Sequence, residues 1–342
     1  MSLWPVYTGG GEPHAGIGQL PPPPPWRAFN GTPLLPPPSE DPDDASASPD
    51  RTHRAETYVV TDRSVELVNA ALYLRRPLLV TGPPGSGKSS LPYAVARELM
   101  LGPVLRWNIT SRSTLTDGLY QYDPLSRLYA SRETEAFSGS GIEDHLRLGP
   151  LGTALLPYRD PRVLLIDEID KGDLDLPNDL LNVLEEGQFE IPELVRTAHH
   201  TPYAEVLMSG GDWRTRVHRG RVRCNAFPFV VLTSNGEREF PPAFLRRCVT
   251  LELRQPDESQ LKAIVEAHLG ELDQDALELV DRFLRRASGG ELATDQLLNA
   301  VYLTRTSGLT GTSRSRLAEH LMPYLSQGFE PGEPRPDDAD DF

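Results

Sequence analysis

Cysteine and lysine are scarce in this chain of 342 residues, which contains 2 cysteines and three lysines, Lys88, Lys171 and Lys262. Cys224 and Cys248 are isolated and have no histidines at a metal-ligand spacing, so we expect buried free thiols rather than a disulfide or a metal site. Arginine is the usual basic residue in this chain. The presence of one of its few lysines, Lys88, inside a glycine-rich loop is therefore improbable by chance.

Long apolar runs are also missing. No run approaches the roughly 18 residues that a membrane helix needs, and the N-terminus lacks the basic-then-apolar order of a signal peptide. These absences predict a cytoplasmic protein without a membrane anchor. His199 and His200 have no third ligand at a useful spacing, and we interpret them as loop residues.

The net charge of −15 argues against general nucleic-acid binding. Six acids and one arginine fall in each of the segments 1–50 and 328–342, so each carries −5 and the remaining residues carry −5. A local basic patch at 214–223 stays open.

Proline is concentrated near the N-terminus, where residues 1–50 hold 13 of the 33 prolines. With few aliphatic residues, residues 1–53 are predicted to be a Pro-rich, acidic, disordered arm, and residues 328–342 an acidic disordered tail. Within the arm, Pro21 to Trp26 is either a polyproline II ligand for an aromatic groove or part of a disordered leader. The folded part should comprise an α/β domain at 54–255 and a helical domain at 256–327.

The stretch Thr81 to Ser89 reads TGPPGSGKS and has the spacing of a phosphate-binding P-loop. An apolar strand precedes it and a helical pattern follows it. Glycine leaves the backbone N–H groups open to phosphates, Lys88 can reach the β- and γ-phosphates, and the Ser89 hydroxyl can bind Mg²⁺. The predicted nucleotide-binding residues are Gly82, Pro83, Pro84, Gly85, Ser86, Gly87, Lys88, Ser89 and Ser90.

Two further strands end in polar residues. Arg162 to Asp167 contains four consecutive aliphatics, which predict a strand buried on both faces, and Asp167 and Glu168 emerge at its carboxyl end. Carboxylates there fit a Walker B pattern, with Asp167 as Mg²⁺ ligand and Glu168 activating the attacking water. Asn235 follows the strand 227–233 and could orient that water or touch the γ-phosphate. Taken without the other motifs, it would be a turn-forming residue beside Gly236.

Strands alternate with helical patterns up to residue 255, and four helical patterns follow at 259–269, 275–286, 294–306 and 313–325. This order predicts an α/β fold, a P-loop NTPase parallel-sheet domain followed by a small all-helical lid. The long segment from Pro192 to Arg223 carries Trp213, His218 and several arginines. It is either a client-contacting loop or a solvated insertion.

Together the motifs GPPGSGKS, LLIDE, LTSN and FLRRC resemble the AAA+ ATPase superfamily over roughly residues 56–327. Within it the chain looks most like the MoxR family, because of the LGPLG step at 148–152 and the helix and hairpin pattern at 178–191. The resemblance implies Asn235 as sensor 1 and Arg247 as an arginine finger acting in trans. It also implies a homo-oligomeric ring, commonly a hexamer, that remodels a protein client, often one with a von Willebrand factor A domain.

The chain departs from that family at two positions. Arg246-Arg247-Cys248 stands where Asp-Arg-Phe is usual, so either arginine could be the finger, although alignment favours Arg247. The sensor 2 arginine is absent from the segment 291–295, and Arg305 or another subunit could replace it.

These features predict an ATP- and Mg²⁺-dependent ATP hydrolase whose ring does conformational work on a protein partner. Two alternatives remain: a regulatory scaffold in which ATP occupancy governs assembly and hydrolysis is slow, and a DNA-acting motor, against which the acidic core argues.

Overall fold

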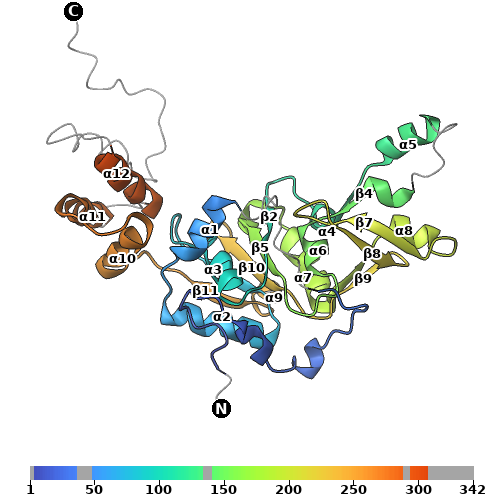
Figure 1. Ribbon diagram of the computed structural model, residues 1–342, viewed down its shortest axis with the longest axis horizontal. Helices are drawn as coiled ribbons and strands as arrows, with labels where there is room; N and C mark the ends of the chain where they lie inside the picture. Colours follow the sequence, from blue (N-terminus) through green and yellow to red (C-terminus); the bar gives the residue numbers. More distant parts are fainter. Residues whose placement is uncertain (1–3, 37–47, 134–140, 288–292, 307–342) are drawn as a thin grey trace, which may run out of the picture. The chain divides into compact units, whose positions relative to one another are not determined.

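The computed structural model describes residues 4–36, 48–133, 141–287 and 293–306 (Figure 1). By their contacts the described residues divide into two compact units, which fall within Met1–Gly82 with Gly87–Arg254 and within Pro83–Ser86 with Gln255–Phe342. None of the helices in the described stretches has the length and apolar character that crossing a membrane requires. The predicted tail at 328–342 and the predicted helix at 313–325 lie outside the described residues.

The first unit is built on a five-stranded sheet in the order β11-β1-β10-β5-β2. Every neighbouring pair is parallel. The strands are β1 (Leu78–Thr81), β2 (Leu105–Asn108), β5 (Val163–Asp167), β10 (Phe229–Ser234) and β11 (Val249–Glu252). The strands predicted at 162–167 and 227–233 are β5 and β10 to within two residues, and the predicted α/β fold is confirmed.

Helices cover both faces of this sheet, because alternate residues of each strand point to opposite sides. Leu78 and Val80 of β1 pack with α2 (Asp62–Leu74) and α3 (Leu91–Glu98) in one buried cluster. Leu79, between them, joins the cluster on the other face, which contains α6 (Pro150–Ala154) and α7 (Leu176–Glu186). The remaining helices of this unit are α1 (Pro49–Glu56), α4 (Leu115–Leu119), α5 (Pro124–Glu133), α8 (Pro192–Thr197) and α9 (Pro242–Leu245).

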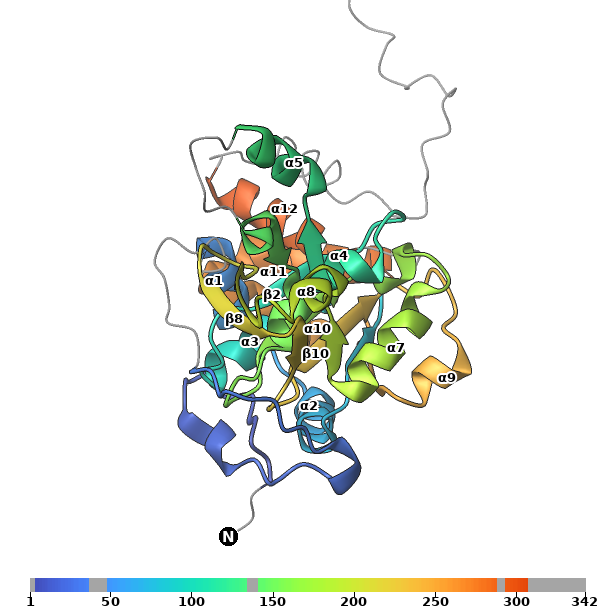
Figure 2. The same cartoon turned by 90° about the vertical axis from the view of Figure 1, so that its right-hand side faces the viewer.

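A second, six-stranded sheet comes from the long segments on either side of β5, with the order β3-β4-β7-β8-β9-β6. Figures 1 and 2 show it beside the central sheet, carrying α8. Its strands are β3 (Tyr120–Tyr122), β4 (Leu146–Leu148), β6 (Gln188–Glu190), β7 (Tyr203–Leu207), β8 (Arg214–His218) and β9 (Arg221–Arg223).

This sheet corrects the interpretation of residues 192–223 as a loop. In β8, Thr215 and Val217 are buried, whereas Arg214, Arg216 and His218 face solvent. The alternation of arginine with smaller residues was therefore the period-two signal of a half-buried strand. The exposed arginines pair with neighbouring carboxylates, Arg214 with Asp144, Arg216 with Glu205 and Arg221 with Glu190.

The N-terminal segment differs from the disordered arm that its composition predicted. Residues 4–36, which we call the strap, belong to the first unit and are extended except for two short 3-10 turns, Ala15–Gln19 and Pro25–Arg27. Val6 and Tyr7 are buried in the cluster beneath α2 and α3. The strap forms no hydrophobic core of its own but contributes side chains to the core of the first unit. Amino-acid composition alone does not reveal such a contribution. Trp26 remains exposed.

Two buried polar side chains of the helices hold the strap's backbone. Asn69 Oδ1 of α2 accepts from the N–H groups of Val6 and Tyr7, at 2.7 and 2.9 Å. Glu98 of α3 accepts from Thr8 and Gly11 N–H. Burial by itself would raise the pKa of Glu98, but these bonds, together with those from the side chains of Thr8 and His14, lower it below its usual value.

Replacing Glu98 by Gln is expected to loosen the strap, because the backbone donors lose their charged acceptor at a cost of about 2 kcal/mol. Acid should act similarly: a carboxylate whose pKa is lowered by folding stabilises the fold above its unfolded pKa, and this contribution is lost as the pH falls. Tryptic cleavage after the buried Arg27 reports release of the strap. The exposed Glu66 of α2, replaced by Gln, is the matched control; equal cleavage of the two variants would contradict the anchor.

Within the part of the second unit that the structure describes there are three helices, α10 (Glu258–Leu269), α11 (Gln274–Ala287) and α12 (Thr294–Thr306). They share a buried cluster that includes Leu261, Val265, Phe283 and Leu297. A capping box at Asp257 starts α10. These helices match the helical region expected of the lid, whose proposed limits stay a prediction.

Candidate nucleotide-binding site

The glycine-rich loop joins β1 to α3 and requires glycine for its backbone. Gly82, Gly85 and Gly87 have φ angles of 152°, 73° and 84°, in the region that side chains rarely adopt. A Cβ atom on Gly87 would also lie 3.2 Å from the ring of Tyr58. The helix itself starts at Leu91, because residues 88–90 complete the turn.

Lys88 lies at the mouth of this loop, where its Nζ donates to the carbonyl of Gly82 at 2.7 Å. It is 7% exposed. Burial lowers the pKa of Lys88, and the negative charges of Asp170, Asp167 and Glu168 act in the opposite direction. The predicted lysine and the predicted Walker B carboxylates therefore share one electrostatic environment.

Asp167 is the centre of a buried hydrogen-bond cluster at the carboxyl end of β5. Its Oδ1 accepts from Ser89 Oγ and from Thr233 Oγ1, each at 2.7 Å. Its Oδ2 accepts from the Arg106 guanidinium, also at 2.7 Å. Burial alone would raise the pKa of Asp167, but the bonds from Thr233, Ser89 and Arg106 outweigh it and lower the pKa. The carboxylate is thus held ionised.

Glu168 follows Asp167 in a left-handed conformation, with φ 60° and ψ 49°. Its N–H donates to Thr233 Oγ1 at 2.9 Å, so a single hydroxyl connects both residues of the acidic pair to β10. A non-glycine residue in this region is strained and is maintained here by that bond. The Glu168 carboxylate is half exposed and lies 2.8 Å from Lys171 Nζ.

Asn235 stands at the end of β10, in a turn organised by Asp170. Asp170 Oδ2 accepts from Ser234 Oγ at 2.8 Å, from Asn235 N at 2.9 Å and from Glu237 N at 3.3 Å. Asp170 is 3% exposed. Asn235, which the sequence predicted as a site residue, is thereby positioned by Asp170. Asp170 lies three residues after Asp167, the last residue of β5.

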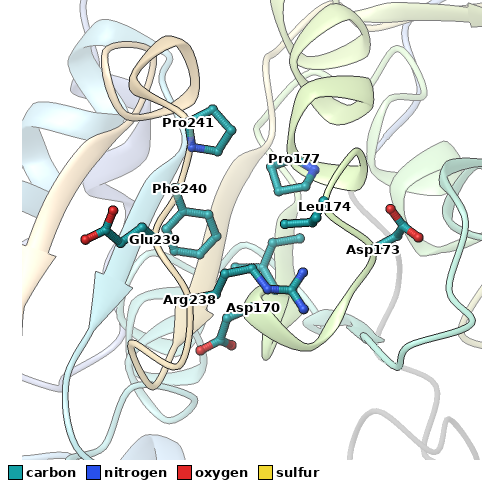
Figure 3. A pocket seen from close by; sticks show the side chains of 9 residues that line it. Asp170, Asp173, Leu174, Pro177, Arg238, Glu239, Phe240 and Pro241 are labelled. Atoms are coloured by element: carbon teal, nitrogen blue, oxygen red, sulfur yellow. The ribbon is translucent and has the colours of Figure 1, made fainter.

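A pocket of about 260 Å³ lies next to this turn, with Asp170 at its edge (Figure 3). Arg238 extends across it and donates to the carbonyl of Gly172 at 2.7 Å. Its lining is mixed, and comprises Ile169, Asp170, Asp173, Leu174, Pro177, Arg238, Glu239, Phe240 and Pro241.

Arg247 lies beyond α9 and points toward α7. Its Nη1 donates to Ala243 O at 3.1 Å, and its Nε is 3.5 Å from Glu185 Oε1. Among the described residues, no hydrogen bond or ion pair joins Arg247 to Lys88, Asp167 or Glu168. Arg246 is exposed, and its carbonyl accepts from Arg76. The structure thus brings together the predicted site residues at the carboxyl ends of β1, β5 and β10 and leaves the predicted finger outside that cluster.

Three residues of the cluster were not predicted from the sequence. Arg106 comes from β2, which neighbours β5 in the sheet. Thr233 is part of the motif LTSN but had no role assigned, and Asp170 lies two residues beyond the motif LLIDE. A signal existed for both: Thr233 ends an apolar strand directly before Ser234-Asn235, and Asp170 is a third carboxylate, two residues after the Walker B pair.

Cys224 and Cys248 are free, as expected. Cys224 is buried, whereas Cys248 is partly buried. Burial raises the pKa of each thiol to about 12, so neither is a thiolate at neutral pH.

A comparison with protein families identifies the family that has these motifs. The AAA domain family, in its dynein-related subfamily, matches residues 77–248, which is half of the chain and spans the glycine loop, the acidic strand, Asn235 and Arg247. The chain belongs to this family. The AAA+ superfamily membership predicted from the motifs is confirmed. The individual roles of the site residues stay predictions.

Curated proteins gave no match to the AAA chain. Among solved structures, NtrX from Brucella abortus in complex with ADP is similar, with 16% sequence identity and a TM-score of 0.39. The match covers 80% of this chain and 57% of that one. The chain therefore spans little more than half the length of that solved structure.

Proposed function

We propose that this AAA domain binds ATP with Mg²⁺ and hydrolyses it in a ring of identical subunits. The observation that carries the proposal is the contact between Ser89 Oγ and Asp167 Oδ1, at 2.7 Å. These two oxygens come from separate motifs, and hydroxyl and carboxylate oxygens are the ligands that Mg²⁺ takes in P-loop enzymes.

The donor set fits a magnesium nucleotide. Asp167 is ionised and buried, Ser89 is at its side, and Lys88 supplies a positive charge beside them. The glycines of the loop have positive φ angles and carry no Cβ, so their backbone N–H groups are open to a phosphate. When bound, Mg²⁺ would neutralise charge on the β- and γ-phosphates.

Each residue of the cluster has a task in this reaction. Lys88 would hold the β- and γ-phosphates, and Ser89 and Asp167 would hold the metal. Glu168 would accept the proton of the attacking water, and its half-exposed carboxylate is accessible for that purpose. Asn235, fixed by Asp170, would orient the water or contact the γ-phosphate. Arg106 and Thr233 keep Asp167 ionised and in place.

Arg247 would complete the site of a neighbouring subunit. Its position outside the cluster of its own chain supports a role in trans, because a guanidinium can stabilise transition-state charge only where it reaches the γ-phosphate. Head-to-tail contacts of this kind form a ring where the rotation between subunits closes, and the motif resemblance to the MoxR family favours a hexamer.

The client is proposed to be a protein. The motif resemblance to the MoxR family favours a chaperone-like role, in which the ATP cycle remodels or matures a partner, with a von Willebrand factor A domain protein as the candidate. The second sheet, inserted on either side of β5, is a surface that such a partner could contact.

A slow-hydrolysing scaffold is the second candidate. Arg305, considered as a substitute for the missing sensor 2 arginine, donates to Leu269 O at 2.8 Å and to Glu271 O at 2.6 Å, which ties it to the end of α10. Its contacts thus stabilise the helical unit itself, which favours a lid with weaker influence on the nucleotide.

Measuring ATPase activity per subunit against protein concentration separates the two candidates. Light scattering in ATP and Mg²⁺ gives the oligomeric size in parallel. A ring enzyme should gain specific activity as it assembles. Activity that is negligible and flat across the assembly range would contradict the proposal and favour the scaffold.

A pH profile tests the cluster around Asp167. Thr233→Val removes a hydroxyl that stabilises the carboxylate, so the pKa of Asp167 should rise toward its usual value and the acid limb of the activity profile should move to higher pH. Thr153→Val alters a threonine that is equally buried but bonds to Ser209, and it is the control for stability effects. An unmoved acid limb in Thr233→Val would remove this hydroxyl from the account.

A further inference from the structure

The strap lies against the end of α7, close to the residue that pairs with Arg247. Arg27 of the strap is 4% exposed although it is charged. Its Nη2 donates to Leu184 O at 3.0 Å and its Nη1 to Glu185 O at 3.1 Å, so the guanidinium binds the last carbonyls of the helix. A cation at a helix C-terminus is stabilised both by those carbonyls and by the helix dipole.

The same guanidinium also joins a second helix to this point. Nε and Nη2 of Arg27 donate to Arg75 O, just after α2, at 3.1 and 2.7 Å. The ring of Phe227 lies beneath the guanidinium, with its centroid 4.5 Å from the Arg27 Cζ. Arg27 is therefore held from several sides, and it has little freedom to reorient.

Packing at the end of α7 is adapted to the strap. Gly187 ends the helix with a φ of 60°, and a Cβ atom there would lie 2.5 Å from the ring of Phe29 in the strap. Phe29 in turn stacks on Phe227, with ring centroids 5.6 Å apart. The strap continues onto the second sheet, where Gly31 N donates to Cys224 O at 2.9 Å. The strap is thus anchored on both sides of Arg27.

The carboxylate of Glu185 lies between two arginines. Its Oε2 is 3.6 Å from Arg27 Nη1, and its Oε1 is 3.5 Å from Arg247 Nε. Arg27 is buried and fixed, whereas the side chain of Arg247 is 42% exposed. Arg27 holds one oxygen of the Glu185 carboxylate in place. The other oxygen can therefore orient the more exposed guanidinium of Arg247.

We infer that Arg27 and Glu185 are positioning residues for Arg247, and that the strap thereby sets the direction in which the finger is presented to the neighbouring subunit. This inference rests on the proposed function. Both residues would act through the orientation of the Arg247 guanidinium, which Glu185 contacts directly and Arg27 contacts through Glu185. The N-terminal segment becomes part of the hydrolytic device rather than a passive extension of the fold.

The test uses mixtures of full-length variants in which each site draws its parts from different subunits. The reference mixture combines Glu168→Gln, which retains its finger, with Arg247→Ala, which retains its own catalytic glutamate. Activity in that mixture arises where an Arg247→Ala site meets a Glu168→Gln finger. An inactive reference mixture would contradict the trans mechanism of the proposed function itself, whatever the Glu185 and Arg27 variants show.

Glu185→Gln should be defective as a finger donor and intact as a catalytic site. Mixed with Arg247→Ala it should give less than about one tenth of the reference activity, since misplacement of a catalytic group costs about this much or more. Mixed with Glu168→Gln it should equal the reference, because its own site then receives an intact finger. The KM for ATP should be unchanged in the second mixture.

Arg27→Gln should likewise give low activity when mixed with Arg247→Ala and reference activity when mixed with Glu168→Gln. This result would show that the strap, and not only Glu185, positions the finger. Asn30→Ala is the matched control, because Asn30 belongs to the strap but binds Arg223 and has no contact with Glu185 among the interactions of the described residues. This variant should match wild type in both mixtures, with thermal unfolding monitored for all variants.

Three outcomes would overturn the inference. Reference-level activity of Glu185→Gln with Arg247→Ala would show that the finger needs no positioning by this carboxylate. Low activity in both mixtures would indicate a general structural defect. Higher activity of Glu185→Gln than of wild type would mean that Glu185 restrains Arg247 instead of presenting it.

Discussion

Glu168→Gln is expected to abolish ATP turnover while ATP binding persists. Glutamine preserves the shape and the left-handed backbone bond to Thr233 but cannot accept the proton of the attacking water. A lost general base lowers turnover by about 10²- to 10⁴-fold. Phosphate release under saturating ATP, together with binding of a fluorescent ATP analogue, measures both effects.

Lys88→Ala is expected to weaken ATP binding, which Glu168→Gln leaves intact. It removes the buried charge beside Asp167 and should weaken nucleotide binding itself, by about 2 to 3 kcal/mol. Lys262→Ala is a suitable control, since Lys262 pairs with Glu258 on an exposed face of α10. Equal turnover in wild type and Glu168→Gln would remove Glu168 from the mechanism, and unchanged affinity in Lys88→Ala would contradict the assignment of the loop.

Arg247→Ala is expected to lower turnover by about 10³-fold or more in the assembled ring. An arginine finger is worth about three to five orders of magnitude, because it meets charge that develops only in the transition state. Binding of ATP should be retained, since the described contacts of Arg247 lie on α7 and α9. The measurement is the turnover number at protein concentrations at which light scattering shows the oligomer.

Arg246→Ala is the neighbouring control. Arg246 is exposed and contributes its backbone carbonyl to Arg76, which alanine preserves. Its turnover should stay near that of wild type. A large loss in Arg246→Ala with little loss in Arg247→Ala would exchange the roles of the two arginines, an alternative that the sequence leaves open.

Much of the central sheet could be predicted because its strands are buried on both faces. Continuous aliphatic runs such as Val163 to Ile166 indicate a buried strand in an α/β chain, and the polar residues after them mark the edge where ligands bind. The glycine loop was predictable for a similar reason: its spacing reflects the geometry of phosphate binding, which few other structures require.

The strap was not predictable from composition. Its prolines and small residues suggest disorder because they cannot form a core together, yet Val6 and Tyr7 complete a core that other segments begin. The informative residues lay elsewhere, in Asn69 and Glu98, polar side chains on the buried faces of helices. Unsatisfied there, each would cost free energy, so each implies a partner from outside the helix.

The role of Asp170 was also hidden, for a different reason. It follows the Walker B pair in sequence and is easily counted as one more solvated carboxylate. Its importance comes from the neighbouring strand β10, whose turn supplies three donors to one oxygen. Contacts between strands distant in sequence depend on sheet order, which local patterns do not specify.

Mixing inactive subunits tests the split site most directly. Glu168→Gln and Arg247→Ala should each be inactive alone, and an equal mixture should recover up to about one quarter of wild-type activity, the fraction of interfaces in a random ring that pair an intact site with an intact finger. Recovery at that level would establish catalysis across subunits. No recovery, with light scattering showing mixed oligomers, would contradict a ring ATPase whose sites are shared between neighbours.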